Sequence, residues 1–295
     1  MKKFLFTALF LSFIICPAFS NEMTEDYFDI ATNYVVAGNY REALNYLDKI
    51  LMIEPNNANA QDLRNGLRQI VQGNNKSFIL PKSPAVKQSI DAKKTGNKQG
   101  ELNALTSGND YWAYYFLGEY YKENKDFAQA ITYFIKSVNA RPSFVQCYLE
   151  IAVCYYEQGN YNQAVTYLNQ YIKINPNDDF GYSLRARCQA NLGNNESALN
   201  DILTAMAFEN SVDYRFLEGK ILYNMHRYSQ AAEKLDALTN DIQTAEIYKY
   251  LGLSQAEAGN TSDAIINLEK SIILSDDDKL VNKKYNELKM GIANE

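Results

Sequence analysis

A fixed period of 34 residues runs through most of this chain. Pro142 and Pro176 are 34 residues apart, and Ala130, Ala164 and Ala198 follow one another at the same interval. A period of this size is typical of stacked supersecondary units, because one such unit cannot bury its apolar faces alone. The period therefore predicts a repeat protein and excludes a fold built around a single central core.

Within each period the large residues recur every three or four positions, which predicts two amphipathic helices. One first helix reads Tyr148-x-x-Ile151-Ala152-x-x-Tyr155, with the small alanine allowing a second helix to approach closely. A Gly-Asn pair then supplies a residue that tolerates the left-handed conformation at the end of a helix. It stands at the expected helix–helix turn of four periods, at 38–39, 159–160, 193–194 and 259–260. A proline ends the second helix in several periods.

This arrangement resembles the tetratricopeptide repeat family, whose pattern is W/Y-x2-L-G-x2-Y, then A-x3-F, then P. Tyr114, Leu117, Gly118 and Tyr121 show the first part of it, and Pro142 the last. The resemblance implies an all-α fold of helical hairpins stacked in a right-handed superhelix, an α-solenoid. In the family's frame we expect a first repeat at 24–57 and five more, which are 111–144, 145–178, 179–212, 212–244 and 245–278.

Three further segments complete the predicted organisation. Residues 21–73 form an N-terminal unit made of the first repeat and a following helix at 58–72, and residues 279–295 form a capping helix with Leu280, Tyr285 and Leu288 on one side. The segment 74–110 has six lysines between 76 and 98 against one acid, Asp91. It is either a solvated linker, acting as a hinge, or a degenerate repeat of two short helices, about 84–94 and 98–106, around Gly96.

The first twenty residues have the composition of a secretory signal peptide. Lys2 and Lys3 precede an apolar run from 4 to 15, and Ala18-Phe19-Ser20 supplies a cleavage site. The alternative is an uncleaved anchor, but about twelve apolar residues are too few to span a bilayer as a helix. Lipidation at Cys16 is disfavoured by Ile15. We therefore expect an exported protein of the periplasm or cell envelope, without a membrane span after the signal is removed.

Composition restricts the chemistry further. Without residues 1–20 the chain has 27 basic and 35 acidic residues, so we expect no nucleic-acid partner. Of the three remaining cysteines, Cys147 and Cys154 are too far apart on one helix to pair, and all three are predicted to be buried hydrophobes. With one histidine, His226, predicted at a helix–helix turn in the usual place of glycine, we find no catalytic, metal or cofactor site and expect no enzyme and no cofactor.

The resemblance also implies where a partner would bind. In the family the outward positions of each first helix, commonly the second, fifth, ninth, twelfth and thirteenth, line a concave groove. Aromatic residues and arginine anchor interfaces well, although aromatic residues at helical spacing also pack in cores. The candidate groove residues are Trp112, Tyr115, Glu119, Tyr156, Phe180, Arg187, Phe216, Lys220 and Tyr223. The Lys/Asn carboxylate clamp of some family members is missing, so the groove is predicted to favour an apolar or aromatic segment, alone or with one acidic contact.

The fourth repeat departs from the family pattern, because Asn195 stands where the second helix usually begins with an aromatic residue and Asn210 replaces the terminal proline.

Two function classes follow from the whole pattern. The first is a non-catalytic scaffold that holds a protein or peptide partner in the groove. The alternative is an accessory, chaperone-like factor for envelope assembly or secretion that acts on client proteins. The sequence leaves the partner and the oligomeric state open.

Overall fold

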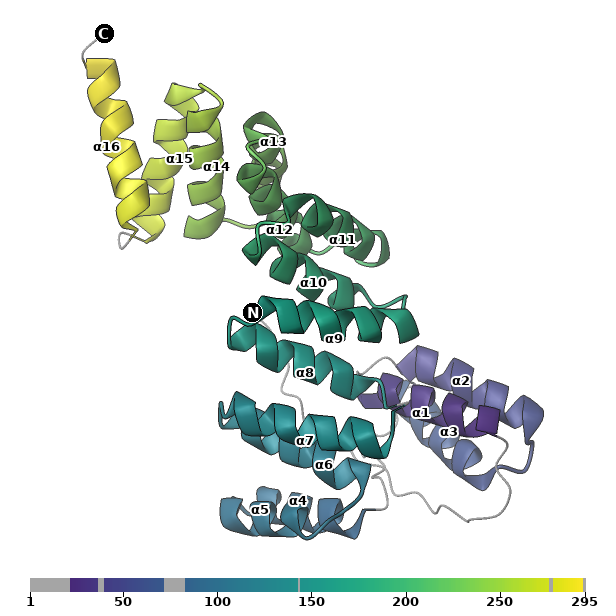
Figure 1. The fold of residues 1–295 in the computed structure, drawn as a ribbon. Coiled ribbons are helices and arrows are strands. Elements are labelled where there is room, and N and C mark those ends of the chain that lie inside the picture. Colours follow the sequence, from purple (N-terminus) through teal and green to yellow (C-terminus); the bar gives the residue numbers. More distant parts are fainter. Residues whose placement is uncertain (1–21, 37–39, 72–82, 143, 276–277, 294–295) are drawn as a thin grey trace. The chain divides into compact units, whose positions relative to one another are not determined.

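The computed structural model describes residues 22–36, 40–71, 83–142, 144–275 and 278–293. The predicted signal peptide and the glycine at 38 lie outside these ranges. All the regular elements within them are α-helices, which confirms the predicted all-α repeat fold (Figure 1). The chain divides into two compact units, residues 1–160 and 161–295, and each is described by itself.

The first unit holds eight helices among its described residues. They are α1 (Glu22–Val36), α2 (Tyr40–Ile53), α3 (Ala58–Val71), α4 (Pro84–Lys94), α5 (Lys98–Thr106), α6 (Tyr111–Glu123), α7 (Phe127–Ala140) and α8 (Gln146–Glu157). Each of α2 and α7 ends two residues before a proline, Pro55 and Pro142. Sequential neighbours pack together within α1–α3 and within α4–α8.

The second unit continues the pattern with eight more. They are α9 (Tyr161–Ile174), α10 (Asp179–Asn191), α11 (Asn195–Phe208), α12 (Val212–Asn224), α13 (Tyr228–Leu238), α14 (Ala245–Glu257), α15 (Thr261–Leu274) and α16 (Lys279–Ala293). Helices α10 to α15 form three hairpins, and α16 covers the last of them.

Small residues bring the two helices of a hairpin into contact, as predicted. A methyl group added at Gly118 in α6 would stand 2.5 Å from the ring of Phe134 in α7. The same addition at Gly219 or Gly252 would meet Leu235 at 2.7 Å or Leu268 at 2.8 Å. These distances are far below van der Waals contact, so only glycine permits this approach at those points.

The described turns between the two helices of a repeat use a left-handed residue. Gly159, Gly193 and Gly259 have φ of 72°, 80° and 87°, which confirms the predicted role of the Gly-Asn pairs. Two non-glycine residues take the same place, Lys125 with φ 62° and His226 with φ 58°. His226 is an exposed turn residue, as the sequence predicted.

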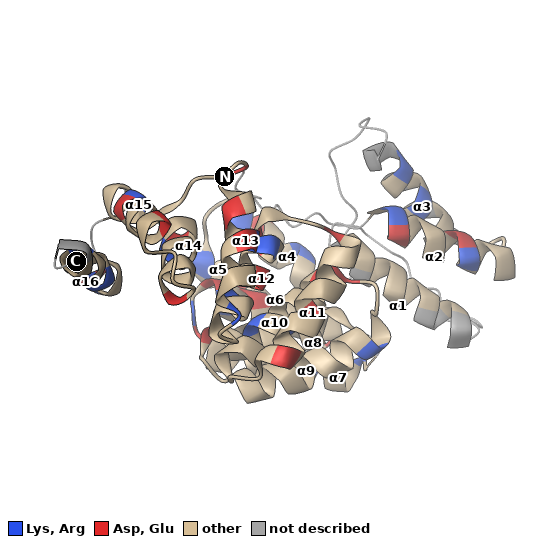
Figure 2. Cartoon of the chain, turned by 90° about the horizontal axis from the view of Figure 1, so that it is seen from above, with Lys and Arg blue, Asp and Glu red and all other residues tan. Residues whose placement is uncertain are grey.

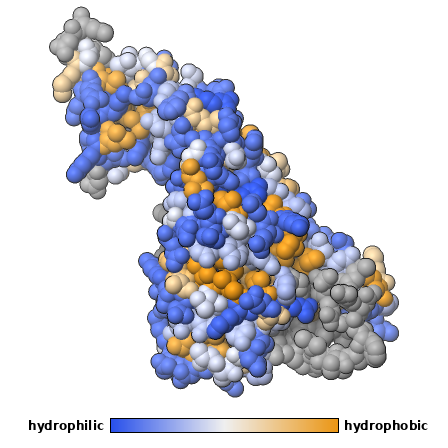
Figure 3. Space-filling view, in the orientation of Figure 1, coloured by the Kyte–Doolittle hydropathy of each residue, from blue (hydrophilic) through white to orange (hydrophobic). Residues whose placement is uncertain are grey.

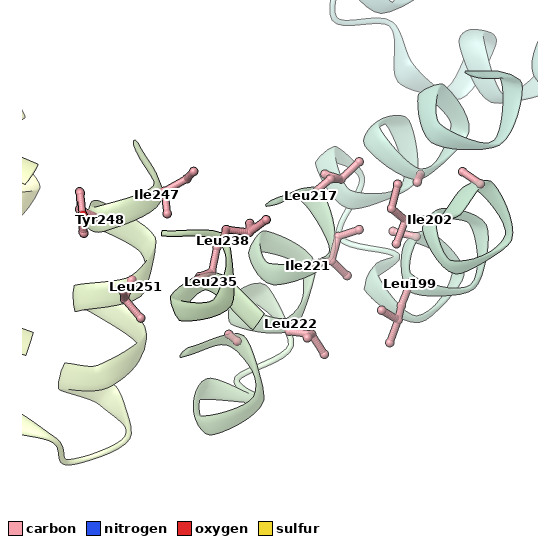
Figure 4. Close-up of a cluster of buried hydrophobic side chains, with 14 residues drawn as sticks. Leu199, Ile202, Leu217, Ile221, Leu222, Leu235, Leu238, Ile247, Tyr248 and Leu251 are labelled. Atoms are coloured by element: carbon pink, nitrogen blue, oxygen red, sulfur yellow. The ribbon is translucent and has the colours of Figure 1, made fainter. Parts of the chain in front are cut away.

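The core consists of buried apolar side chains between each helix and the next. In the second unit a continuous cluster extends from α10 through α14, with Ile202, Ile221 and Leu235 fully buried (Figure 4). Side chains of α11 face α12, and those of α13 face α14, so each hairpin is closed by the next. This is the arrangement that repeat units need in order to bury their outer faces.

The lysine-rich segment contains a helical hairpin rather than a linker over the residues that the structure describes. Helices α4 and α5 have the predicted bounds, and Gly96 between them has φ 71°. Val86 and Ile90 of α4 are buried in a cluster with Leu105 and with Leu117 of α6. The hairpin therefore packs as a degenerate repeat on the hairpin α6–α7.

The capping helix α16 is present, but its buried face is not the predicted one. Val281 is fully buried, and Tyr285 and Leu288 pack against the same cluster. Leu280 is 55% exposed, so its assignment to that face is wrong. The oxygen Oδ1 of Asp278 accepts hydrogen bonds from the backbone N–H groups of Leu280 and Val281 and so caps the start of the helix.

The three cysteines of the described chain, Cys147, Cys154 and Cys188, are free and buried, as predicted. Burial raises the pKa of the thiols of Cys154 and Cys188 to about 12. They act as small apolar side chains, because only the thiolate is reactive.

Candidate functional site

The candidate groove residues lie on the first helices of four repeats, α6, α8, α10 and α12. Seven of them are half-buried, which is the exposure expected of side chains that pack on one side and face solvent on the other. Six of the nine lie in two places, three on α6, which contacts α8 in the first unit through Lys122 and Glu150, and three on α12, which contacts α14 in the second. The structure supports a description of each place by itself.

Trp112 belongs to an aromatic cluster at the start of α6. Its ring centre lies 4.9 Å from that of Phe144 and 6.3 Å from that of Phe116. Tyr115 lies deeper, 5.1 Å from Phe144 and 5.6 Å from Phe134 between ring centres, and is 4% exposed. Tyr115 is therefore a core residue and not the groove-facing residue that the sequence predicted. Burial raises the pKa of its hydroxyl well above the usual value.

Two carboxylates share one ammonium group farther along α6. Lys122 Nζ lies 2.7 Å from Glu119 Oε1, and it also donates a hydrogen bond to Glu150 of α8. Gln146 Nε2 donates to the other oxygen of Glu150 at 2.7 Å. Burial, together with the charge of Glu150, raises the pKa of Glu119 to about 7 despite the attraction of Lys122. Burial lowers the pKa of Lys122, but the two carboxylates outweigh it and the net shift is upward.

The second place joins aromatic rings and a lysine on α12 and α14. Lys220 Nζ lies 3.0 Å from Glu246 Oε1, 5.3 Å from the ring centre of Phe216 and 4.8 Å from that of Tyr250. Tyr250 also contacts Phe216 and Tyr223, at 5.9 Å and 5.6 Å between ring centres. The lysine is held above two ring faces while its charge is paired, which is the geometry of a cation–π contact.

The remaining three candidates lie between these places along the chain. Phe180 of α10 is 47% exposed, and Tyr156 and Arg187 are half-buried. The structure does not bring Phe180 and Arg187 into either of the two clusters. They stay predictions as contact residues.

Sequence analysis missed the residues that complete each cluster, Phe144, Glu150, Glu246 and Tyr250. Glu150 and Tyr250 both occupy the sixth position of their repeat, and Lys284, which pairs with Glu257 at 2.7 Å, occupies the corresponding position of the capping helix. The sixth position therefore faces the first helix of the preceding repeat. Other repeats have a leucine at this position, Leu184 and Leu217. A charged or aromatic residue there was the sequence signal that could have identified these contact residues.

Charge is mixed over the helices. Figure 2 shows acidic and basic residues on the same helices, α2, α3 and α15 among them. The view in Figure 3 shows apolar side chains in separate patches among hydrophilic ones. Among the described residues, no helix combines the length and the apolar character needed to cross a membrane.

Two family models match parts of the chain. Residues 121–188 match the model described as tetratricopeptide repeat, and residues 30–72 match the one described as Fis1 C-terminal tetratricopeptide repeat. The comparison with curated protein sequences finds no match.

Several solved structures have a similar fold, and three of them illustrate the range. The structure of YrrB, described as "a TPR protein with an unusual peptide-binding site", has a TM-score of 0.54 at 17% identity and covers 66% of this chain and 96% of its own. A MamA structure from Desulfovibrio magneticus RS-1 has a TM-score of 0.50 at 18% identity, covering 53% and 92%. The structure of the Cut9–Hcn1 complex has a TM-score of 0.52 at 18% identity, and the match covers 89% of this chain and 48% of that one. At these identities the likeness is one of fold.

Proposed function

We propose that this chain, which carries tetratricopeptide repeats, is a non-catalytic scaffold that holds a segment of a partner protein along the first helices of its repeats. The observation that carries the proposal is the cluster on α12 and α14. Phe216, Lys220, Tyr223 and Tyr250 are all half-buried, and the three aromatic side chains pack against the edge of the core while staying partly open to solvent. Side chains of these types, held rigid and partly open to solvent, are the usual anchors of a protein interface.

The geometry also indicates the chemistry of the partner. Lys220 is already paired with Glu246, and Lys122 with two carboxylates, so neither ammonium group is available as a clamp for an acidic segment. The rings of Phe216 and Tyr250 offer apolar area beside that paired charge. This arrangement favours an apolar or aromatic partner segment, in agreement with the sequence-based prediction. YrrB, whose fold is similar, is described as having a peptide-binding site, which supports a peptide as the kind of partner.

The proposal includes export to the periplasm or cell envelope, supported by the pattern of residues 1–20. Fractionation of cells that carry the full chain, beside a variant lacking residues 2–20, tests this part. We expect the full chain outside the cytoplasm and the shortened chain inside it. Equal distribution of the two forms would remove export from the proposal.

Site-specific photo-crosslinking tests the binding surface. A photoreactive phenylalanine at Phe216 should give one discrete adduct in the cells that make the protein. The matched control replaces Leu203 of α11, which is 46% exposed but lies on a second helix. A scaffold gives an adduct at position 216 and none at 203. The same broad set of adducts at both positions would instead support the accessory factor that acts on many clients.

A further inference from the structure

A small hollow opens between the turns of two successive hairpins in the second unit. Its volume is about 360 Å³, and its walls include Ala190 and Asn195 from the hairpin α10–α11 and Tyr223, His226 and Tyr228 from the hairpin α12–α13. None of the lining residues is Lys, Arg, Asp or Glu. The hollow is therefore polar and aromatic but lacks carboxylate, ammonium and guanidinium groups.

The repeat frame explains why this space exists. Tyr223 and Tyr228 hold the twelfth and seventeenth positions of the fifth repeat, and their ring centres are 5.6 Å apart. The same two positions of the fourth repeat hold Ala190 and Asn195. The fourth repeat therefore has no aromatic ring at either position. The rings of Tyr223 and Tyr228 in the fifth repeat border the space that is left there.

Two polar features belong to residues that line this hollow. The oxygen Oδ1 of Asn195 is buried and has no hydrogen-bond partner within the described chain. A buried acceptor without a donor costs about 1–3 kcal/mol, which a guest with an N–H or O–H group would recover once rotation of the carboxamide brings Oδ1 to the wall of the hollow. His226 stands at a turn position where four other described turns have glycine, and its Nδ1 contacts the hydroxyl of Tyr228. The imidazole thereby adds a third ring to the wall.

We infer that this hollow receives one aromatic side chain of the partner segment, a tryptophan or a tyrosine. A planar ring would pack against Tyr223, Tyr228 and His226, as aromatic pairs do at centre distances of about 4.5–7 Å. The indole N–H or the phenol O–H would supply the donor that Asn195 lacks. The positions that line the hollow from α10 and α12 belong to the predicted groove, so the inference rests on the proposed function and specifies one contact of it.

The single histidine of the chain allows a direct test. The probe is N-acetyl-tryptophanamide, added to the full chain labelled with ¹³C while the imidazole signal of His226 is followed by NMR. We expect a saturable shift with a dissociation constant of about 1 mM, as suits one ring in an open site. N-acetyl-leucinamide and N-acetylglucosamine serve as comparison probes. A shift as large with either of them, or none with the tryptophan probe, overturns the inference.

The decisive variant is Asn195→Tyr, which restores the ring that the fourth repeat lacks. It should weaken binding of the probe at least tenfold while the midpoint of thermal unfolding stays equal or rises. Asn200→Tyr, at an exposed position of the same helix, is the matched control and should bind like the wild type. If Asn195→Tyr fails to fold, Ala190→Leu narrows the hollow from α10 and decides the question. Wild-type binding in the folded variants would refute the pocket.

The outcome separates this inference from the proposed function. A partner crosslinked at Phe216 together with an unmoved His226 signal would remove the pocket and leave the scaffold. A saturable probe shift without any crosslinked partner would keep the pocket and remove the scaffold.

Discussion

The hairpin α6–α7 with its neighbour α8, and the hairpin α12–α13 with its neighbour α14, use one backbone frame for different chemistry. Both have a glycine at the eighth position, Gly118 or Gly219, against a large residue of the second helix. At the seventh position α6 has Leu117, which is 1% exposed, whereas α12 has Glu218, which is 4% exposed. The frame thus keeps its geometry when a core leucine is replaced by a carboxylate.

The ion pairs of the second unit explain how such a carboxylate is accommodated. Glu218 Oε1 lies 3.0 Å from Lys234 Nζ, at the twenty-third position of the same repeat. One repeat earlier the order of charges is reversed, with Arg185 at the seventh position and Asp201 at the twenty-third, joined at 2.7 Å. In the second repeat these positions hold Leu117 and Tyr133. The comparison teaches that the seventh and twenty-third positions act as a pair, either both uncharged or oppositely charged.

The largest expected effect on stability comes from placing a carboxylate at the seventh position of a repeat that has no basic residue at the twenty-third. Leu117→Glu buries a carboxylate opposite Tyr133, and we expect it to lower the free energy of unfolding by about 4 kcal/mol, since an uncompensated buried charge costs that much. Denaturant unfolding of the full chain, followed by circular dichroism, measures it. The control is Ala128→Glu at an exposed site of α7, with a change near zero. Equal loss in the two variants would show that burial is not the cause.

The next effect concerns the carboxylate that α6 shares with Lys122. Because the pKa of Glu119 is about 7 when folded and near 4.5 in an unstructured chain, the folded form holds the proton more tightly. The free energy of unfolding should therefore fall by up to about 3 kcal/mol as pH rises from about 4.5 to 7, and stay level above that. Unfolding of wild type and Glu119→Gln across this range isolates the contribution. A constant difference between the two would contradict it.

The smallest effect is a gain of stability in α12. Glu218 Oε2 is buried and has no hydrogen-bond partner within the described chain, so Glu218→Leu should raise the free energy of unfolding by about 1–2 kcal/mol. Lys234→Met is the matched variant and should lower it, because it leaves the whole carboxylate unpaired. The two midpoints of thermal unfolding should therefore move in opposite directions from the wild type. A shift of both midpoints in the same direction would mean that the contributions of Glu218 and Lys234 to stability are not coupled.

The sequence predicted the helices, the turns and the closely packed small residues, because these depend on contacts inside one period. Tyr115 was assigned to the groove, yet the rings of Phe134 and Phe144 enclose it. Leu280 was assigned to the buried face of the capping helix, yet its neighbour Val281 is the buried residue and Leu280 is 55% exposed. Glu150 and Tyr250 were missed for a related reason, since their partners lie in the preceding repeat and the spacing within one period does not contain that contact.

The sixth-position contacts also bear on how such a chain can be rearranged during evolution. Each charged pair across a repeat boundary, Lys122 with Glu150 and Glu257 with Lys284, is divided between two neighbouring 34-residue cassettes. A cassette that is duplicated or moved takes along only half of the pair. If the C-terminal cap followed the second repeat directly, Lys284 would face Lys122 at the twelfth position as well as Glu123 at the thirteenth, where the sixth repeat has Ala256 and Glu257. A rearranged order of repeats would therefore separate the residues of these ion pairs and place each of them beside a different side chain.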